Sequence, residues 1–175
     1  MAESAKRISR LCAAALLIAA LSSCGYHLIG AGGGRGIYGG DITSVALPVF
    51  KNITFEPHAS MYVTQAFSQE LVLTGLFDLN KADPDGTFLG TIRRVIIVPN
   101  AMNGTGLVIQ KMVTVEVEVT LLKRDGVVVK RWFFADQEPY MTDDPAAEDF
   151  NKRNAIAIVS GRMARKFTAV LLVDY

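Results

Sequence analysis

The middle of this 175-residue chain alternates strictly between apolar and polar residues. Across 111–123, four valines and a leucine alternate with Met, Thr and Glu, a period of two that is typical of a strand buried on one face. The next residues, Asp125-Gly126, favour a tight hairpin turn. Residues 127–135 are therefore expected to return as the partner strand.

Two further strands and two loops follow from local composition. Residues 42–50 are apolar and rich in strand-forming residues, and residues 87–98 are rich in β-branched residues and end before Pro99. The polar stretch 137–144 and the stretch 100–106, which contains Gly and Asn, are expected to be loops.

Two segments repeat apolar residues at helical spacing. The first starts near Pro57, which fits the first helical turn, and ends near Thr74-Gly75, where the glycine fits a C-cap. The second starts at Pro145. The apolar positions are Ala59, Tyr62, Val63, Ala66, Phe67 and Leu71 in the first segment, and Phe150, Ile156, Val159, Met163, Phe167, Val170 and Leu171 in the second.

This order of elements predicts an α+β fold, β-α-β-β-β-α. We expect a mostly antiparallel four-stranded sheet with two amphipathic helices packed on one face. The other face of the sheet is then left for solvent or a partner.

The N-terminus has the pattern of an export signal. Three basic residues lie within the first ten, and 11–21 is a run of eleven apolar residues without a charge. This run is shorter than the roughly 20 residues that span a membrane. It leads into Leu-Ser-Ser-Cys, ending at Cys24, which resembles the bacterial lipobox. We expect a signal peptide over 1–23 and a lipidated Cys24; the alternative is an ordinary secretory signal whose cleavage site carries a cysteine.

Removal of residues 1–23 leaves a mature protein of 152 residues, enough for one domain with a core. The second cysteine, Cys12, leaves with the signal peptide, so no disulfide within the chain is expected. Residues 24–40, the lipidated cysteine and a stretch rich in glycine, are expected to form a flexible tether, and 41–175 a single domain. The mature chain is nearly neutral, with 15 basic and 16 acidic residues, which argues against nucleic acid as a partner.

Two segments of the mature chain resemble the LptE family of lipopolysaccharide-assembly lipoproteins. The first is the opening pentapeptide Cys24-Gly25-Tyr26-His27-Leu28. The second is a Pro-x-Phe-x-Asn motif formed by Pro48, Phe50 and Asn52, followed by a short link to the first helix. The expected order of elements also matches the fold of this family.

The resemblance implies a function and a location. LptE-like lipoproteins lie inside the lumen of the outer-membrane β-barrel LptD, assist its assembly, plug it, and are thought to bind lipopolysaccharide during its delivery to the cell surface. Gly25, where inner-membrane lipoproteins usually carry Asp, implies a lipid anchor in the outer membrane, facing the periplasm. The alternative is an auxiliary lipoprotein of another envelope secretion or lipid-transport complex.

Residues that would carry catalysis or hold a metal are scarce. The only histidines are His27 and His58, and no cysteine remains as a metal ligand once Cys24 is lipidated. Glu116 and Glu118 are explained by strand alternation. We therefore expect no catalytic residues, no metal and no cofactor, and a chain that is not an enzyme.

Four basic residues surround the expected hairpin turn: Lys123, Arg124, Lys130 and Arg131. Clustered Lys and Arg bind phosphate groups through charge-assisted hydrogen bonds, so these residues are candidate contacts for lipopolysaccharide. The alternative is an ordinary solvated strand face. In the consecutive Trp132-Phe133-Phe134, at least one ring must point away from the core, either to dock on a partner or to be covered by the loop 137–144.

Overall fold

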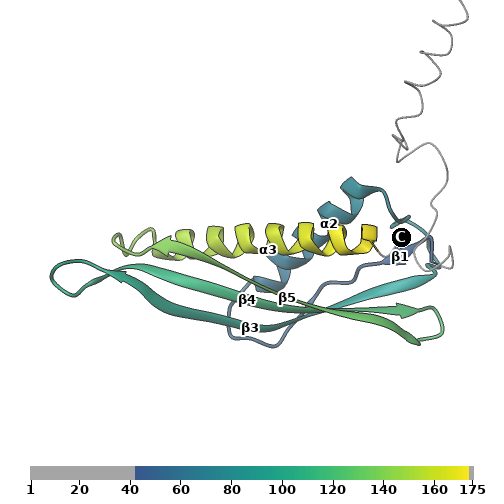
Figure 1. The fold of residues 1–175 in the computed structure, drawn as a ribbon, viewed down its shortest axis with the longest axis horizontal. Helices are drawn as coiled ribbons and strands as arrows, with labels where there is room; N and C mark the ends of the chain where they lie inside the picture. Colours follow the sequence, from purple (N-terminus) through teal and green to yellow (C-terminus); the bar gives the residue numbers. More distant parts are fainter. Residues whose placement is uncertain (1–41, 174–175) are drawn as a thin grey trace, which may run out of the picture. The chain divides into compact units, whose positions relative to one another are not determined.

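A computed structural model describes residues 42–173, which fall within one compact unit of the chain. Their regular elements are β1 (Val45–Ala46), β2 (Lys51–Asn52), α2 (Ala59–Thr74), β3 (Gly86–Met102), β4 (Val108–Lys123), β5 (Val128–Met141) and α3 (Glu148–Val173). The strands form one mixed five-stranded sheet, with α2 and α3 packed against it (Figure 1). The predicted α+β class with two helices is confirmed.

Strands β3, β4 and β5 form an antiparallel meander, which is the larger part of the sheet. The predicted alternation in β4 is confirmed, because the residues on its helix side are fully buried: Val113, Val115, Val117, Val119 and Leu121. The predicted turn is confirmed as well. Gly126 has a φ of 84°, a left-handed conformation that glycine adopts without strain, and its N–H donates to the Lys123 carbonyl.

The expected strand 42–50 is split into two very short strands. Both β1 and β2 pair with the same edge of β3, and both run parallel to it. Val45 pairs with Gly86 and Lys51 with Thr91, so this chain takes one residue more than β3 between the two pairings. The extra length places the 47–50 segment, with Pro48, off the ladder, and the sheet has five strands rather than four.

The turn end of the long β3–β4 hairpin differs from the prediction. Pro99 does not end β3, because no other strand pairs with that edge of β3 within residues 42–173, and an edge position tolerates the missing N–H. The expected loop 100–106 is therefore strand up to Met102. The loop itself is closed by Asn103, whose Oδ1 accepts hydrogen bonds from the backbone of Thr105 and Leu107.

Strand β5 is also longer than predicted, and most of the expected loop 137–144 belongs to it. The polar composition of 137–144 predicted a loop, but Glu138 in this segment and Asp136 just before it point to the helix side and pair with Arg162 of α3. Half-buried ion pairs thus replace the apolar alternation that identifies a half-buried strand.

The first helix closely follows its prediction. It ends at Thr74, and Gly75 adopts the left-handed C-cap conformation with a φ of 60°. Pro57 lies two residues before the first helical residue rather than inside the first turn. The N-cap is His58, which has a φ of 61°.

The second helix begins three residues later than expected, at Glu148 rather than Pro145. Most of its predicted stripe is buried, but Phe150 is exposed, and Val170 is partly so. Phe167 lies at the centre of an aromatic cluster that joins both helices to the sheet. Its ring centroid lies 5.2–5.8 Å from those of Phe67, Phe88, Trp132 and Phe134.

Candidate partner-binding surface

Of the residues that carry the family resemblance, Cys24, Gly25, Tyr26, His27 and Leu28 lie outside the described residues. Pro48, Phe50 and Asn52 are described. Phe50 is fully buried and lies against Gly90 of β3, where an added Cβ would come within 2.2 Å of the Phe50 ring. Its N–H donates to Thr64 Oγ1 of α2 at 2.9 Å. Phe50 therefore joins β3 to α2.

Asn52 folds the loop that leads from β2 to α2. Its Oδ1 accepts hydrogen bonds from the Thr54 N–H and hydroxyl at 2.9 and 2.7 Å, and its Nδ2 donates to the Glu56 carbonyl at 2.9 Å. Glu56 in turn pairs with Lys152 of α3, with 3.0 Å between Oε1 and Nζ. The loop 53–56 is thus held at both ends.

This held loop exposes two large apolar side chains. Ile53 is half exposed, and Phe55 is completely exposed. Between the loop and β3 lies an open hollow of about 370 Å³, whose β3 wall consists of Arg93, Arg94, Val95 and Ile97. Together with Val95 and Ile97 across the hollow, these side chains form contiguous apolar surface, which is a feature of partner-binding sites.

The sheet face turned away from the helices, which we call the outer face, carries a row of charges across three strands. Glu118 of β4 is nearly buried between Arg93 of β3 and Arg131 of β5. Arg93 Nε donates to Glu118 Oε2 at 2.6 Å, whereas Arg131 Nε lies 4.0 Å from Oε1. Arg94 lies 3.6 Å from Glu116. This row of charges therefore has a local excess of one positive charge.

The four basic candidates do not form one cluster. Arg124, at the hairpin turn, is bound to the loop before β3: it donates to the carbonyls of Asp83 and Pro84 and to Asp85 Oδ1 at 3.0–3.2 Å. It also pairs with the Asp83 carboxylate at 3.2 Å. Two carboxylates thus already compensate the charge of Arg124.

The other three candidates point in different directions. Lys130 Nζ lies 5.5 Å from the centroid of the Trp132 ring, at a position whose side chain faces the helices. Arg131 is more than half exposed on the outer face. Lys123 is half-buried at the end of β4. Arg131 is thus the candidate that shares a face with Arg93 and Arg94.

Asp85 joins the start of β3 to the segment that enters β1. Its Oδ2 accepts hydrogen bonds from the N–H and hydroxyl groups of both Thr43 and Ser44, at 2.7–3.2 Å. The hydrogen bonds from Ser44, Lys81 and Thr43 hold the pKa of Asp85 well below its ordinary value. The first described residues are thereby fixed to the sheet.

A second group of charges joins β5 to α3. Arg162 Nε lies 3.1 Å from Asp136 Oδ2, its Nη1 lies 2.6 Å from Glu138 Oε2, and Lys166 Nζ lies 2.9 Å from Asp136 Oδ2. Burial alone would raise the pKa of Asp136, but the hydrogen bonds from Arg162 and Lys166 outweigh it and hold the pKa at about 2.

The three consecutive aromatic residues divide as strand geometry requires. Trp132 and Phe134 pack into the core, and Phe133 is 70% exposed on the outer face. The segment that was expected as a possible cover, 137–144, is mostly strand. Phe133 therefore adds an exposed aromatic ring to the face that carries Arg131.

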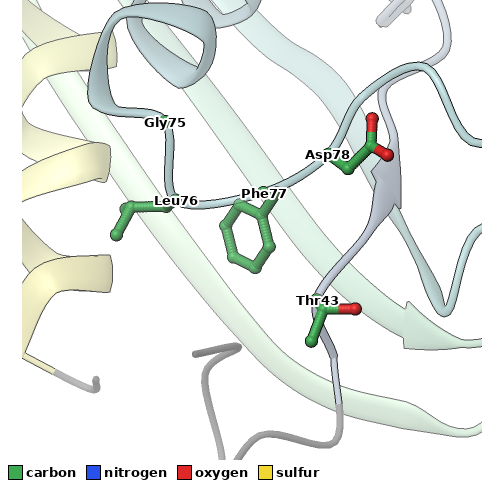
Figure 2. A pocket seen from close by; sticks show the side chains of 5 residues that line it. All are labelled: Thr43, Gly75, Leu76, Phe77 and Asp78. Atoms are coloured by element: carbon green, nitrogen blue, oxygen red, sulfur yellow. The ribbon is translucent and has the colours of Figure 1, made fainter. Parts of the chain in front are cut away.

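A second hollow, of about 410 Å³, lies between the C-terminal end of α2 and the segment entering β1 (Figure 2). Thr43, Gly75, Leu76, Phe77 and Asp78 line it. Asp78 supplies the single carboxylate of this lining.

Among the described residues, no group of three or more His, Cys, Asp and Glu side chains is arranged to hold a metal ion. None of the helices of residues 42–173 is both long and apolar enough to span a membrane.

The sequence did not predict the exposed apolar side chains of the loop 53–56. Ile53 and Phe55 were treated only as a link between strand and helix, and their exposure depends on how Asn52 and Lys152 hold the loop. The signal that was present is local: Asn followed by Thr two residues later favours such a turn. The free edge of β3 depends on where β2 ends, which composition alone does not indicate.

Comparison with known proteins shows the fold. No protein-family model and no curated protein matches the sequence. A protein of Xanthomonas campestris from the DUF330 family is 13% identical, with a TM-score of 0.53, over 75% of this chain and 86% of that one. A proposed lipoprotein of Caulobacter crescentus is 12% identical, with a TM-score of 0.51, over 70% and 87%. A hypothetical protein of Chlamydia trachomatis is 9% identical, with a TM-score of 0.50, over 74% and 95%. The described domain thus has a fold found in several bacterial proteins, one of them described as a lipoprotein.

Proposed function

We propose that this chain is a non-enzymatic lipoprotein subunit of the lipopolysaccharide translocon in the outer membrane. It is anchored through Cys24 on the periplasmic side, assists assembly of an LptD-like β-barrel, plugs that barrel, and binds lipopolysaccharide during delivery. The resemblance of Cys24–Leu28 and of the Pro48–Asn52 motif to the LptE family supports this proposal. Phe50 and Asn52, which belong to that motif, shape the loop 53–56.

The observation that carries the proposal is the row of charges on the outer face. Within residues 42–173 no element packs over this row, and its ion pairs lie beside exposed apolar side chains such as Phe133 and Leu89. The interior of an outer-membrane barrel is polar. A domain that plugs such a barrel would present charged and hydrogen-bonding side chains to the wall, and the row formed by Arg93, Glu118 and Arg131 fits that requirement.

The test is co-purification of the tagged full-length chain from detergent-solubilised outer membranes, with the partners identified by mass spectrometry. We expect a large outer-membrane β-barrel in stoichiometric amount. Recovery of a different envelope machine without a barrel would overturn the proposal and favour the auxiliary-lipoprotein alternative. The Cys24→Ala chain is the control for the anchor, and it should no longer incorporate labelled palmitate.

Lipopolysaccharide binding has its own test. The candidates remain Lys123, Arg124, Lys130 and Arg131. We place Arg131 first, because Arg124 is already compensated by Asp83 and Asp85. Arg131→Ala should lower the amount of lipopolysaccharide recovered with the purified chain, whereas Arg153→Ala, an exposed arginine on α3, should not. Equal recovery from both variants would exclude Arg131 as a contact.

A further inference from the structure

One edge of the sheet changes its character along β3. In its first part, β3 pairs with β1 and β2, and this ladder ends where the Ile53 N–H donates to the Ile92 carbonyl at 3.3 Å. Beyond Ile92, β3 continues to Met102 and pairs with β4 only. Within residues 42–173, no strand lies on the other side of this part of β3. Alternate N–H and C=O groups of such an edge face outward, available to another strand.

The features that protect an edge from pairing, charges, a proline and register shifts, lie at the two ends of this free segment, at Arg93, Arg94 and Pro99, and not within it. From Arg94 to Pro99, β3 keeps an unbroken register with β4, between two register shifts. Four consecutive residues in this window, Val95 to Val98, are β-branched and apolar, and three of them are exposed by more than a third. A regular apolar edge promotes association unless it is covered. The opposite edge of the sheet differs, because at the same level β5 carries Asp136, Glu138 and Pro139.

The loop 53–56 forms a wall beside this edge. It leaves the ladder after Ile53, and the hollow of about 370 Å³ separates it from Arg93, Arg94, Val95 and Ile97. The bonds of Asn52 and Glu56 described above hold this wall in place. A strand beside β3 would therefore rest its side chains against Phe55 without a rearrangement of the loop.

We propose that this edge accepts an extended segment of the barrel partner, which adds to β3 as a further strand over Arg94–Val98. The inference rests on the function proposed above. A closed barrel wall has no free edge of its own, so the segment comes from a loop or a terminal extension of the barrel chain. Its chemistry follows from the edge: apolar side chains pack on Phe55 and Ile97, and a carboxylate lies beside Arg94. Arg94 is suited to this contact, because it is largely exposed and its ion pair with Glu116 is loose, at 3.6 Å.

Hydrogen exchange on the full-length lipoprotein, alone and in its co-purified complex with the barrel, tests the inference. Strand addition predicts that alternate amides within 94–98 exchange at least about tenfold more slowly in the complex, while the exposed amides of β5 change little. If the barrel co-purifies but these β3 amides exchange as fast as in the free chain, the inference fails and the proposed function stands. If no barrel co-purifies, both fail. Self-association that protects the edge in the free chain would overturn the inference in favour of a second copy.

A pair of variants tests whether the loop 53–56 binds the partner through Phe55. Phe55→Ala should lower barrel recovery about tenfold, the size of effect expected from truncating one aromatic anchor of an interface. Leu73→Ala, which truncates an exposed residue in the last turn of α2, is the matched control and should leave recovery unchanged. Equal recovery from both variants would contradict the role of Phe55. Unchanged unfolding curves for Phe55→Ala would show that any loss is not a folding defect.

Discussion

Both halves of β3 contain large apolar residues, but the strands and side chains around them differ. In the near half, 86–92, the edge is paired with β1 and β2, and Phe88 and Ile92 are fully buried. In the far half, 94–102, the edge is free, and on the same helix side Val95 is half-buried and Ile97 is exposed. The helices also contact the two halves differently. Aromatic rings fill the space over the near half, whereas ion pairs connect α3 to the far part of β5.

This difference separates stability from binding within one strand. Burial of large apolar side chains supplies most of the free energy of folding, and that burial is concentrated in the near half. The far half keeps its shape through pairing with β4, and its exposed apolar residues contribute little to folding. Apolar residues that the fold leaves exposed in a regular strand are therefore better explained by a partner than by the core.

The largest effect on stability is expected in the near half. Phe167→Ala removes the ring at the centre of the aromatic cluster and leaves a cavity that its neighbours cannot fill. We expect the free energy of unfolding to fall by about 3–5 kcal/mol, measured by urea denaturation. A loss below about 1 kcal/mol would show that the cluster does not carry the stability of the domain.

Gly90→Ala tests the close approach between β3 and the family motif. The added Cβ would meet the buried Phe50 ring at 2.2 Å, so either the ring or the strand must move. We expect a loss of about 3 kcal/mol, the upper end of the range for overpacked cores. The control is Gly104→Ala in the far hairpin loop, where an added Cβ meets nothing within 4 Å, and its unfolding curve should match that of the wild type.

The ion pairs between β5 and α3 make stability depend on pH. The pKa of Asp136 is about 2 in the folded chain against an ordinary value of 3.8, so its contribution is present above about pH 4 and is lost as the pH falls toward 2. Each pKa unit corresponds to about 1.4 kcal/mol, which gives a contribution of about 2 kcal/mol. Asp136→Asn should remove this part of the pH dependence, and Asp143→Asn, at an exposed position before α3, should retain it. Identical acid unfolding of the two variants would contradict this assignment.

The smallest effect on stability is expected in the far half. Val98→Thr keeps a β-branched residue at a position that is 46% exposed, so the free energy of unfolding should change by no more than about 0.5 kcal/mol. A loss comparable to that of Phe167→Ala would remove the distinction between the two halves.

Local pattern predicted the elements of this fold better than their ends. The period of two in β4, the Asp125-Gly126 turn and the Gly75 cap depend on adjacent residues, and all three are confirmed. Pro99 and the polar residues of β5 were read as strand breakers because sequence does not show that one lies at an edge and that the others meet Arg162.

The surface was less predictable than the fold. The basic residues around the hairpin turn are neighbours in sequence, but the pleat of β5 places the side chains of Lys130 and Arg131 on opposite faces. Arg124 forms ion pairs with Asp83 and Asp85, which are 41 and 39 residues away in sequence. Phe55 lies beside the free part of β3 because β2 ends at Asn52. Long-range pairing determines both outcomes, and no local pattern encodes it.

The most direct test of the account compares two positions on the outer face of β3. Val98 in the far half and Leu89 in the near half are 46% and 44% exposed, so a photo-crosslinking residue is equally accessible at either site of the free chain. In outer membranes, the account predicts strong crosslinking to the barrel from position 98 and much weaker crosslinking from position 89. Equal crosslinking from both positions, or stronger crosslinking from 89, would contradict the claim that the far half is where the partner binds.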